Sequence, residues 1–201
     1  MQRKTLVVMV KEPRPGRVKT RLGHEIGMTR AAWWFRHQVA FLLRSITDPR
    51  WDVVLAVAPD VAGMASRVWP AHLPRLAQGT GDLGDRMRHL FRTMHTGPVC
   101  IIGADIPGIR RTHINTAFRA LGRHDAVFGP ATDGGFWLVG LKRPTPVPPA
   151  LFANVRWSSE HALSDSLAGL KDARVCKIDV LRDVDTKADL SCFAHDGAIT
   201  S

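Results

Sequence analysis

Short runs of uniformly apolar residues alternate along this chain with stretches of helical periodicity. The runs lack the polar alternation of a strand with one wet face, so they predict strands that are covered on both faces. Strands of this kind form a mostly parallel sheet with helices on either side, which is a Rossmann-like, three-layer α/β/α sandwich. The predicted strands are residues 6–10, 53–58, 99–102, 125–129, 136–141 and 174–178.

Amphipathic stretches between these runs supply the predicted helices. One covers residues 28–45 and another covers residues 83–94, each with apolar residues at helical spacing. Thr112 is the expected N-cap of a later helix, and Ser158 is the expected N-cap of the last. A chain of 201 residues with 45% hydrophobic content can bury one sizeable core, so we predict a single domain over residues 1–201.

The basic charge of the chain is concentrated near its N-terminus. Of a formal net charge of +10, most comes from the first fifty residues, which hold 11 of the 28 Lys and Arg but only 3 of the 18 Asp and Glu. Five cations fall in a Gly- and Pro-containing loop directly after the first apolar run. A local cluster of this kind indicates a site for a polyanion rather than a generally basic protein. The five are Lys11, Arg14, Arg17, Lys19 and Arg21.

A nucleic-acid-binding module is an alternative interpretation, because basic patches with stacking aromatics bind single strands and the chain has six tryptophans. Most of these tryptophans fall in helical or strand patterns that core packing explains, and no recognised nucleic-acid motif is present. The first apolar run is too short for a signal peptide or a membrane span. We therefore expect a cytoplasmic protein with neither a nucleic-acid nor a membrane partner.

Carboxylates follow two of the predicted strands, as a metal–phosphate site requires. Asp105 lies in a turn stiffened by glycine and proline after residues 99–102, and Asp185 lies beyond the last strand. Ligands of doubly wound sheets bind outside the carboxyl ends of the strands, where the basic loop also begins. Mg²⁺ or Mn²⁺ bound to phosphates typically takes one or two protein carboxylates, which makes Asp105 and Asp185 the predicted ligands. The alternative is an Asp105 that only caps the turn toward the next helix.

Two loops that contain glycines are predicted to complete the site. The first opens the helix of residues 83–94, where free amides can hold an anion or a base carbonyl, although an aspartate there also serves as an ordinary N-cap. The second permits a close backbone approach beside an aspartate that can meet a hydroxyl or a second metal, or it forms a simple hairpin turn. The residues assigned to binding are Gly79, Gly81, Asp82, Asp133, Gly134 and Gly135.

Five ordered motifs run through nearly the whole chain. Together they resemble the GT-A-type nucleotide-diphospho-sugar transferase superfamily, and specifically the bacterial DUF2064 family, also labelled glycosyltransferase A. The first and last motifs are also similar to those of the phospholactate guanylyltransferase and molybdenum-cofactor nucleotidyltransferase groups, in which corresponding loops hold metal, triphosphate and base. The motifs are Lys-x-Pro-x-x-Gly-x-x-Lys-Thr-Arg-Leu at 11–22, Gly-Asp-Leu-Gly-x-Arg-Met at 81–87, Gly-x-Asp-x-Pro at 103–107, Asp-Gly-Gly-aromatic at 133–136 and Asp-Val-Asp-Thr-x-x-Asp-Leu at 183–190.

The resemblance implies a nucleotide-binding transferase of the GT-A type. The five cations supply more positive charge than a nucleotide-sugar diphosphate requires, which favours nucleotidyl transfer from a nucleoside triphosphate to a small phosphorylated acceptor. Glycosyl transfer from a nucleotide sugar is the alternative. In that reaction Asp105 would hold the diphosphate metal, and Asp133 would face the donor sugar or act as base toward an acceptor hydroxyl.

Roles for the basic loop follow from the favoured reaction. Phosphoryl chemistry is catalysed mainly by positioning and by cations that stabilise developing charge. We therefore assign catalytic roles to Lys19, Arg21 and Asp105. Lys11, Gly16 and Arg17 are assigned to nucleotide binding.

Overall fold

The computed structural model describes residues 3–143 and 146–190, and it places seven strands and six helices within them. The predicted α/β architecture is confirmed. The strands are β1 (Thr5–Lys11), β2 (Asp52–Ala58), β3 (Arg75–Ala77), β4 (Val99–Gly103), β5 (Ala126–Pro130), β6 (Phe136–Leu141) and β7 (Val175–Lys177). The helices are α1 (Thr20–Ile26), α2 (Met28–Ile46), α3 (Asp60–Ala65), α4 (Leu83–Thr93), α5 (Arg111–Ala120) and α6 (Ala162–Ala168).

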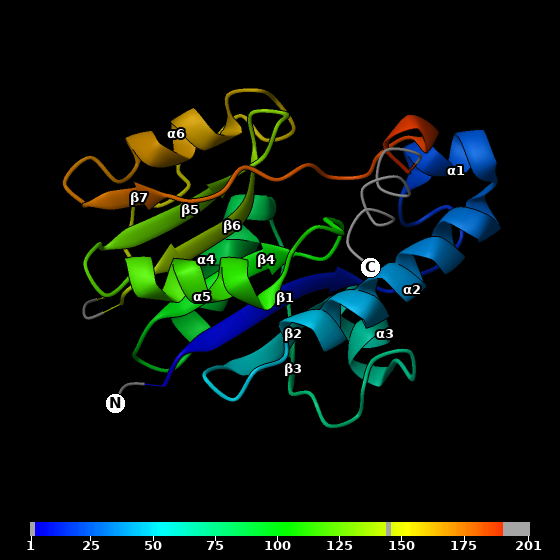
Figure 1. Ribbon diagram of the computed structural model, residues 1–201, viewed down its shortest axis with the longest axis horizontal. Coiled ribbons are helices and arrows are strands. Elements are labelled where there is room, and N and C mark those ends of the chain that lie inside the picture. Colours follow the sequence, from blue (N-terminus) through cyan, green and yellow to red (C-terminus); the bar gives the residue numbers. More distant parts are fainter. Residues whose placement is uncertain (1–2, 144–145, 191–201) are drawn as a thin grey trace.

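One mostly parallel sheet contains all seven strands, in the order β3-β2-β1-β4-β6-β5-β7 (Figure 1). Strand β6 is antiparallel to both of its neighbours, β4 and β5. The reason is the short connection of residues 131–135, which is long enough for a hairpin but not for the crossover that a parallel pair requires. The hairpin alternative for this loop is therefore the observed structure.

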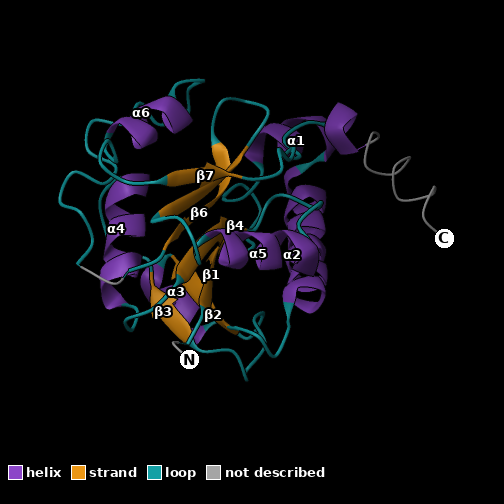
Figure 2. Ribbon diagram, turned by 60° about the vertical axis from the view of Figure 1, so that its left-hand side comes forward, coloured by secondary structure: helices purple, strands orange, loops and turns teal. Residues whose placement is uncertain are grey.

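Helices cover both faces of the sheet, with α4 and α6 on one side and α2 and α5 on the other (Figure 2). Successive residues of β1 enter the two resulting cores: Leu6 and Val8 pack with α2 and α5, whereas Val7 packs with α4. This two-sided burial explains why the apolar runs show no polar alternation. None of the helices in the described part of the chain is long and apolar enough to cross a bilayer.

Four features differ from the elements predicted from the sequence. The first is α1, which begins at Thr20 within the end of the predicted basic loop and runs to Ile26, and the second is the short strand β3. The third is the start of α6, which follows His161 instead of Ser158. Ser158 has a left-handed backbone (φ 58°), a conformation that is not that of a helix N-cap, so it cannot fill the predicted role. The fourth is the start of α5, which follows Arg110 and not Thr112.

Tryptophan burial agrees with the core interpretation at most positions. Trp51, Trp69 and Trp137 expose 5%, 4% and 2% of their surface. Trp33, on the outer side of α2, is an exception, with 63% exposed. The tryptophans therefore do not form a common stacking surface for bases.

The position of the site follows from the strand order. From β1 the chain moves to β2 on one side, whereas β4 pairs with the other side of β1. The loops that leave the carboxyl ends of β1 and β4 consequently diverge. The place where the strand order reverses in this way is a topological switch point, and doubly wound sheets bind their ligands there.

Candidate active site

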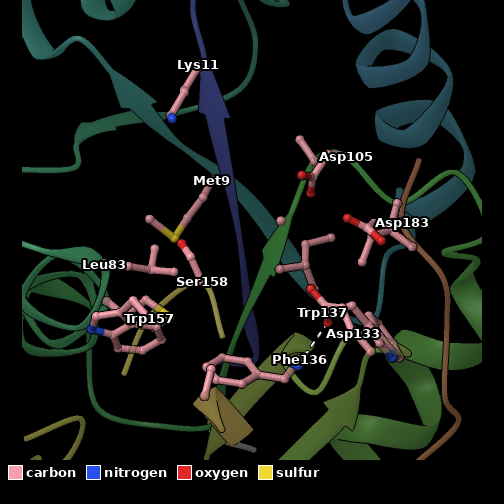
Figure 3. Close-up of a pocket in the computed structure, with 18 of the residues that line it drawn as sticks. Met9, Lys11, Leu83, Asp105, Asp133, Phe136, Trp137, Trp157, Ser158 and Asp183 are labelled. Atoms are coloured by element: carbon pink, nitrogen blue, oxygen red, sulfur yellow. Dashed lines mark hydrogen bonds between the residues drawn. The ribbon is translucent and has the colours of Figure 1, made fainter. Parts of the chain in front are cut away.

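A cavity of about 700 Å³ opens at this switch point (Figure 3). Its walls come from segments far apart in the sequence: the loop after β1, the start of α4, the turn after β4, the β5–β6 hairpin, the segment before α6 and the segment after β7. The volume is within the range of small-molecule sites in proteins. Every motif that was singled out in the sequence therefore contributes residues to one cavity.

Most of the predicted site residues line this cavity. They are Lys11, Arg17, Lys19, Arg21, Gly81, Asp82, Asp105, Asp133, Gly135 and Asp185. The remaining three, Gly16, Gly79 and Gly134, lie outside its lining, and their φ angles are 72°, 80° and 85°. These angles favour glycine, which gives each of the three a role in shaping its turn.

Lys19 is the centre of the charged end of the cavity. Its Nζ lies 3.2 Å from Asp105 Oδ2 and 2.8 Å from Asp185 Oδ1. The Lys19 side chain is only 6% exposed, whereas those of Asp105 and Asp185 are 45% and 33% exposed. Arg21 reaches Asp185 Oδ2 at 3.2 Å from a largely exposed position. One buried ammonium therefore joins the turn after β4 to the segment after β7.

The charges of this cluster shift the pKa values of two of its members, Lys19 and Asp183. Burial lowers the pKa of Lys19, but the Asp105 and Asp185 carboxylates outweigh burial, so the net pKa is raised and the ammonium stays charged. Burial also raises the pKa of Asp183, and repulsion from Asp185 adds to the increase while Lys19 opposes it. Asp133 is close enough to contribute as well. The carboxylates thus outnumber the ammonium that they surround.

The backbone at Lys19 is unusual for a residue with a side chain. It adopts the left-handed conformation (φ 45°, ψ 49°) at the position that precedes α1. This conformation costs about 1–2 kcal/mol for a residue other than glycine. Non-glycine residues in such conformations cluster at functional sites, where the surrounding structure holds them in place.

Four aspartates of the predicted motifs have structural partners, and one of them, Asp189, accepts hydrogen bonds from the N–H and the hydroxyl of Thr186. Asp82 and Asp85 form the capping box of α4, with N–H···O distances of 2.8 and 3.2 Å. Asp133 Oδ1 accepts the N–H of Gly135 at 2.9 Å and so stabilises the hairpin loop. Asp82 and Asp133 still line the cavity. Asp105 does not cap α5, because the N-cap of that helix is Arg110.

A largely apolar wall faces the acidic group across the cavity. Figure 3 shows Met9, Leu83, Phe136 and Trp157 there, with Ser158 beside them. This wall was not predicted from the sequence, apart from the aromatic residue that ends the hairpin motif. No pattern in the sequence signals it, since Leu83 reads as part of a helical stripe and Ser158 reads as a cap.

The donor set of the charged end fits a divalent cation. Asp105 and Asp185 already direct carboxylate oxygens at one positive group, the ammonium of Lys19, which takes the place that a metal ion would take between them. Within residues 3–143 and 146–190 no group of three or more His, Cys, Asp or Glu side chains is arranged to hold a metal. Two carboxylates suffice for Mg²⁺ or Mn²⁺ when phosphates and water supply the other ligands.

Comparison with known families gives one match. The model of the family described as "Uncharacterized protein conserved in bacteria (DUF2064)" matches residues 42–159. No curated protein matches the chain significantly.

Solved structures share the fold over essentially the whole chain. A candidate nucleotide-diphospho-sugar transferase from Desulfovibrio desulfuricans G20 is 28% identical, with a TM-score of 0.90 over 100% of this chain and 90% of that protein. CMP:2-keto-3-deoxy-manno-octonic acid synthetase, complexed with CTP, is 10% identical, with a TM-score of 0.60 and full coverage of both chains. Rv0371c from Mycobacterium tuberculosis H37Rv, in complex with manganese, is 13% identical, with a TM-score of 0.57 over 96% of this chain and 99% of that protein. The last two similarities show the fold alone.

Proposed function

Because this chain belongs to the bacterial DUF2064 family, whose members have no assigned activity in that description, we propose a function from its site: metal-dependent nucleotidyl transfer from a nucleoside triphosphate to a small phosphorylated acceptor. The observation that carries the proposal is the buried Lys19 ammonium between Asp105 and Asp185 in a cavity with further cations. A cytoplasmic location, where nucleoside triphosphates are available, suits this reaction.

The cations of the cavity match a triphosphate. Within the described residues, the lysine and arginine side chains that form salt bridges in the cavity are those of Lys19 and Arg21. The side chains of Lys11 and Arg17 are therefore available to pair with the phosphates of a ligand. A triphosphate spreads its negative charge over three phosphoryl groups, and several separate cations hold it better than one. Lys19 and Arg21 are the proposed catalytic cations, because they also contact the carboxylate end of the cavity, where charge changes during transfer.

Asp105 and Asp185 are the residues that would hold the metal. When bound, Mg²⁺ or Mn²⁺ neutralises charge on the phosphate oxygens. The CTP and manganese complexes of the two distant structures that share this fold support a nucleotide and a metal in folds of this kind. The acidic surplus around Lys19 supports the same assignment, since four carboxylates lie near two cations, Lys19 and Arg21. The four belong to Asp105, Asp133, Asp183 and Asp185.

An acceptor phosphate removes the need for a general base. Its oxygens are already ionised near neutral pH, so the attack on the α-phosphorus needs positioning and charge neutralisation but no proton removal. This suits a cavity in which Asp133 is engaged by the N–H of Gly135.

Glycosyl transfer from a nucleotide sugar is the second candidate. It is favoured by the similarity to the Desulfovibrio protein and by Asp133, which lines the cavity and could take a proton from an acceptor hydroxyl. The two reactions differ in their donor, which makes the donor the quantity to measure.

A thermal-stability screen distinguishes the two. The four ribonucleoside triphosphates and common nucleotide sugars would be tested with and without Mg²⁺. A ligand at 100 times its dissociation constant adds about 2.7 kcal/mol to the free energy of unfolding, a readily measured shift. We expect a triphosphate to stabilise the protein more than any nucleotide sugar, and only with the metal. Stabilisation by a nucleotide sugar alone would favour glycosyl transfer, and no response to either class would contradict both proposals.

A further inference from the structure

The ammonium of Lys19 lies where a metal bound by Asp105 and Asp185 would have to lie. Its hydrogen bonds to the two carboxylates are 3.2 and 2.8 Å long. A divalent ion such as Mg²⁺ takes the same oxygens at about 2.0–2.1 Å. If both were present, the ammonium and the metal ion would contact the same two carboxylate oxygens and would lie close to each other. Like charges at such a short separation repel strongly. The ion and the ammonium therefore compete for the same two oxygens, Asp105 Oδ2 and Asp185 Oδ1.

Displacing Lys19 without a replacement partner is unfavourable. The side chain is 6% exposed, so an ammonium that loses both carboxylates stays largely desolvated and unpaired. The free energy of leaving the ammonium unpaired therefore weakens the binding of a metal ion without nucleotide. The phosphates of a nucleotide change the balance, because their oxygens are strong acceptors for an ammonium and can take Lys19 over from Asp105 and Asp185.

We propose that Lys19 is a resident cation that keeps the metal position closed until a triphosphate draws its ammonium away, so that metal and nucleotide enter the cavity together. The inference rests on the proposed nucleotide and metal site and extends it. Lys19 then has two successive sets of partners, the carboxylates in the free protein and the phosphates in the loaded one. Its role is to couple the two binding events and thereby to keep a metal without substrate out of the cavity.

A simpler explanation of coupled binding makes a different prediction for the same residue. If the metal binds weakly alone only because it lacks phosphate ligands, Lys19 plays no part in excluding it. Removing the lysine would then leave the affinity for metal alone unchanged. If Lys19 occupies the position, its removal makes metal alone bind more tightly while nucleotide binds more weakly. The two effects have opposite signs, which separates this role from a general loss of structure.

The test is a titration of Mn²⁺ alone into the wild-type protein and into Lys19→Met. Methionine has an unbranched side chain one atom shorter than that of lysine, and it removes the charge; as another residue with a Cβ, it is restricted at φ 45° as lysine is. Lys19→Gly is the second variant, since glycine adopts this conformation without strain and protects the fold against the loss of the ion pairs. Lys11→Met is the matched control: it removes one positive charge from the same cavity at a residue without a salt bridge in the described structure.

We expect both Lys19 variants to bind Mn²⁺ alone about tenfold or more tightly than the wild type, with a much smaller change in Lys11→Met. Each of the four ribonucleoside triphosphates, tested separately with Mn²⁺, should lose affinity for the Lys19 variants. Unchanged or weaker Mn²⁺ binding in both variants, or an equal gain in Lys11→Met, overturns the role of Lys19. If the wild type still binds Mn²⁺ with a triphosphate in that case, the proposed function stands. A wild-type protein that binds neither overturns both.

Discussion

Lys19 and Asp185 are 166 residues apart in the sequence, yet the ammonium of one lies 2.8 Å from the carboxylate of the other. Lys19 ends the loop after β1, and Asp185 follows the edge strand β7. The sheet between them holds both at its carboxyl edge, although β1 and β7 are separated by three other strands. The contact closes the charged end of the cavity, and the first two predictions below test it.

Lys19→Ala and Arg21→Ala should each weaken triphosphate binding while the fold stays intact. Charge-assisted hydrogen bonds to phosphate are worth about 1.5–3 kcal/mol. The effect of Arg21 should be the smaller one, because its side chain is 78% exposed and water screens its charge. Isothermal titration calorimetry measures both, with Arg44→Ala on the exposed side of α2 as the control. Unchanged affinity in both variants would show that these two cations do not contact the triphosphate.

Asp105→Asn should abolish turnover and the metal dependence of nucleotide binding. The substitution keeps the shape and removes the charge, and Asp185 still pairs with Lys19, so the melting temperature of the free protein should change little. Asp185→Asn should have a milder effect, because the neighbouring Asp183 can partly replace it. Asp172→Asn, at an exposed position outside the cavity, serves as the control. An Asp105→Asn variant that unfolds but keeps metal-dependent binding in the folded fraction would assign Asp105 a structural role.

Gly134→Ala should destabilise the protein more than Gly16→Ala does. Both glycines have positive φ, so alanine is strained at each by about 1–2 kcal/mol. At Gly16 an added Cβ meets nothing, whereas at Gly134 it collides with the backbone of Glu160. The collision adds about 1–3 kcal/mol, as overpacking does elsewhere. Urea denaturation gives the two free energies, and equal losses would show that the hairpin loop can move away from Glu160.

The stability of the protein should decrease in mild acid partly through His113. The pKa of His113 is lowered, chiefly by burial, and its ring Nδ1 accepts the N–H of Arg110 at 3.1 Å. The folded-state pKa lies below the unfolded value of about 6.5, so the folded protein favours the neutral ring. The contribution of this neutral ring to the free energy of unfolding is fully present above about pH 6.5 and is lost as the pH falls through the folded-state pKa.

The variant His113→Asn tests this pH dependence. Asparagine keeps an acceptor and does not titrate, so the free energy of unfolding should fall less steeply between about pH 7 and about pH 5 than in the wild type. His72→Asn, at an exposed histidine, is the control for the substitution itself. Parallel pH curves for the wild type and His113→Asn would exclude a contribution from this ring.

The sequence alone was sufficient to predict the layers of the fold. Each face of β1 is apolar because it packs against a different helical layer, and that leaves a direct signature in the uniform run of residues 6–10. The elements that were missed had no such signature. Strand β3 contains only three residues, and α1 begins after a lysine in a left-handed conformation without a side-chain cap. Local propensity does not specify either feature, since neighbouring strands and buried ion pairs stabilise them.

The chemical types of the site residues were also readable from the sequence, because cations, carboxylates and glycines follow the ends of predicted strands. Which of these residues come into contact depends on the tertiary structure. Strand order determines that Lys19 lies between Asp105 and Asp185, and the close packing of Gly134 on Glu160 brings the segment before α6 toward the cavity. Charge pairs form only when segments far apart in the sequence come within a few ångströms of each other. The same holds for the apolar wall, which is made of Leu83, Phe136 and Trp157. A one-dimensional pattern specifies the segments but not these distances.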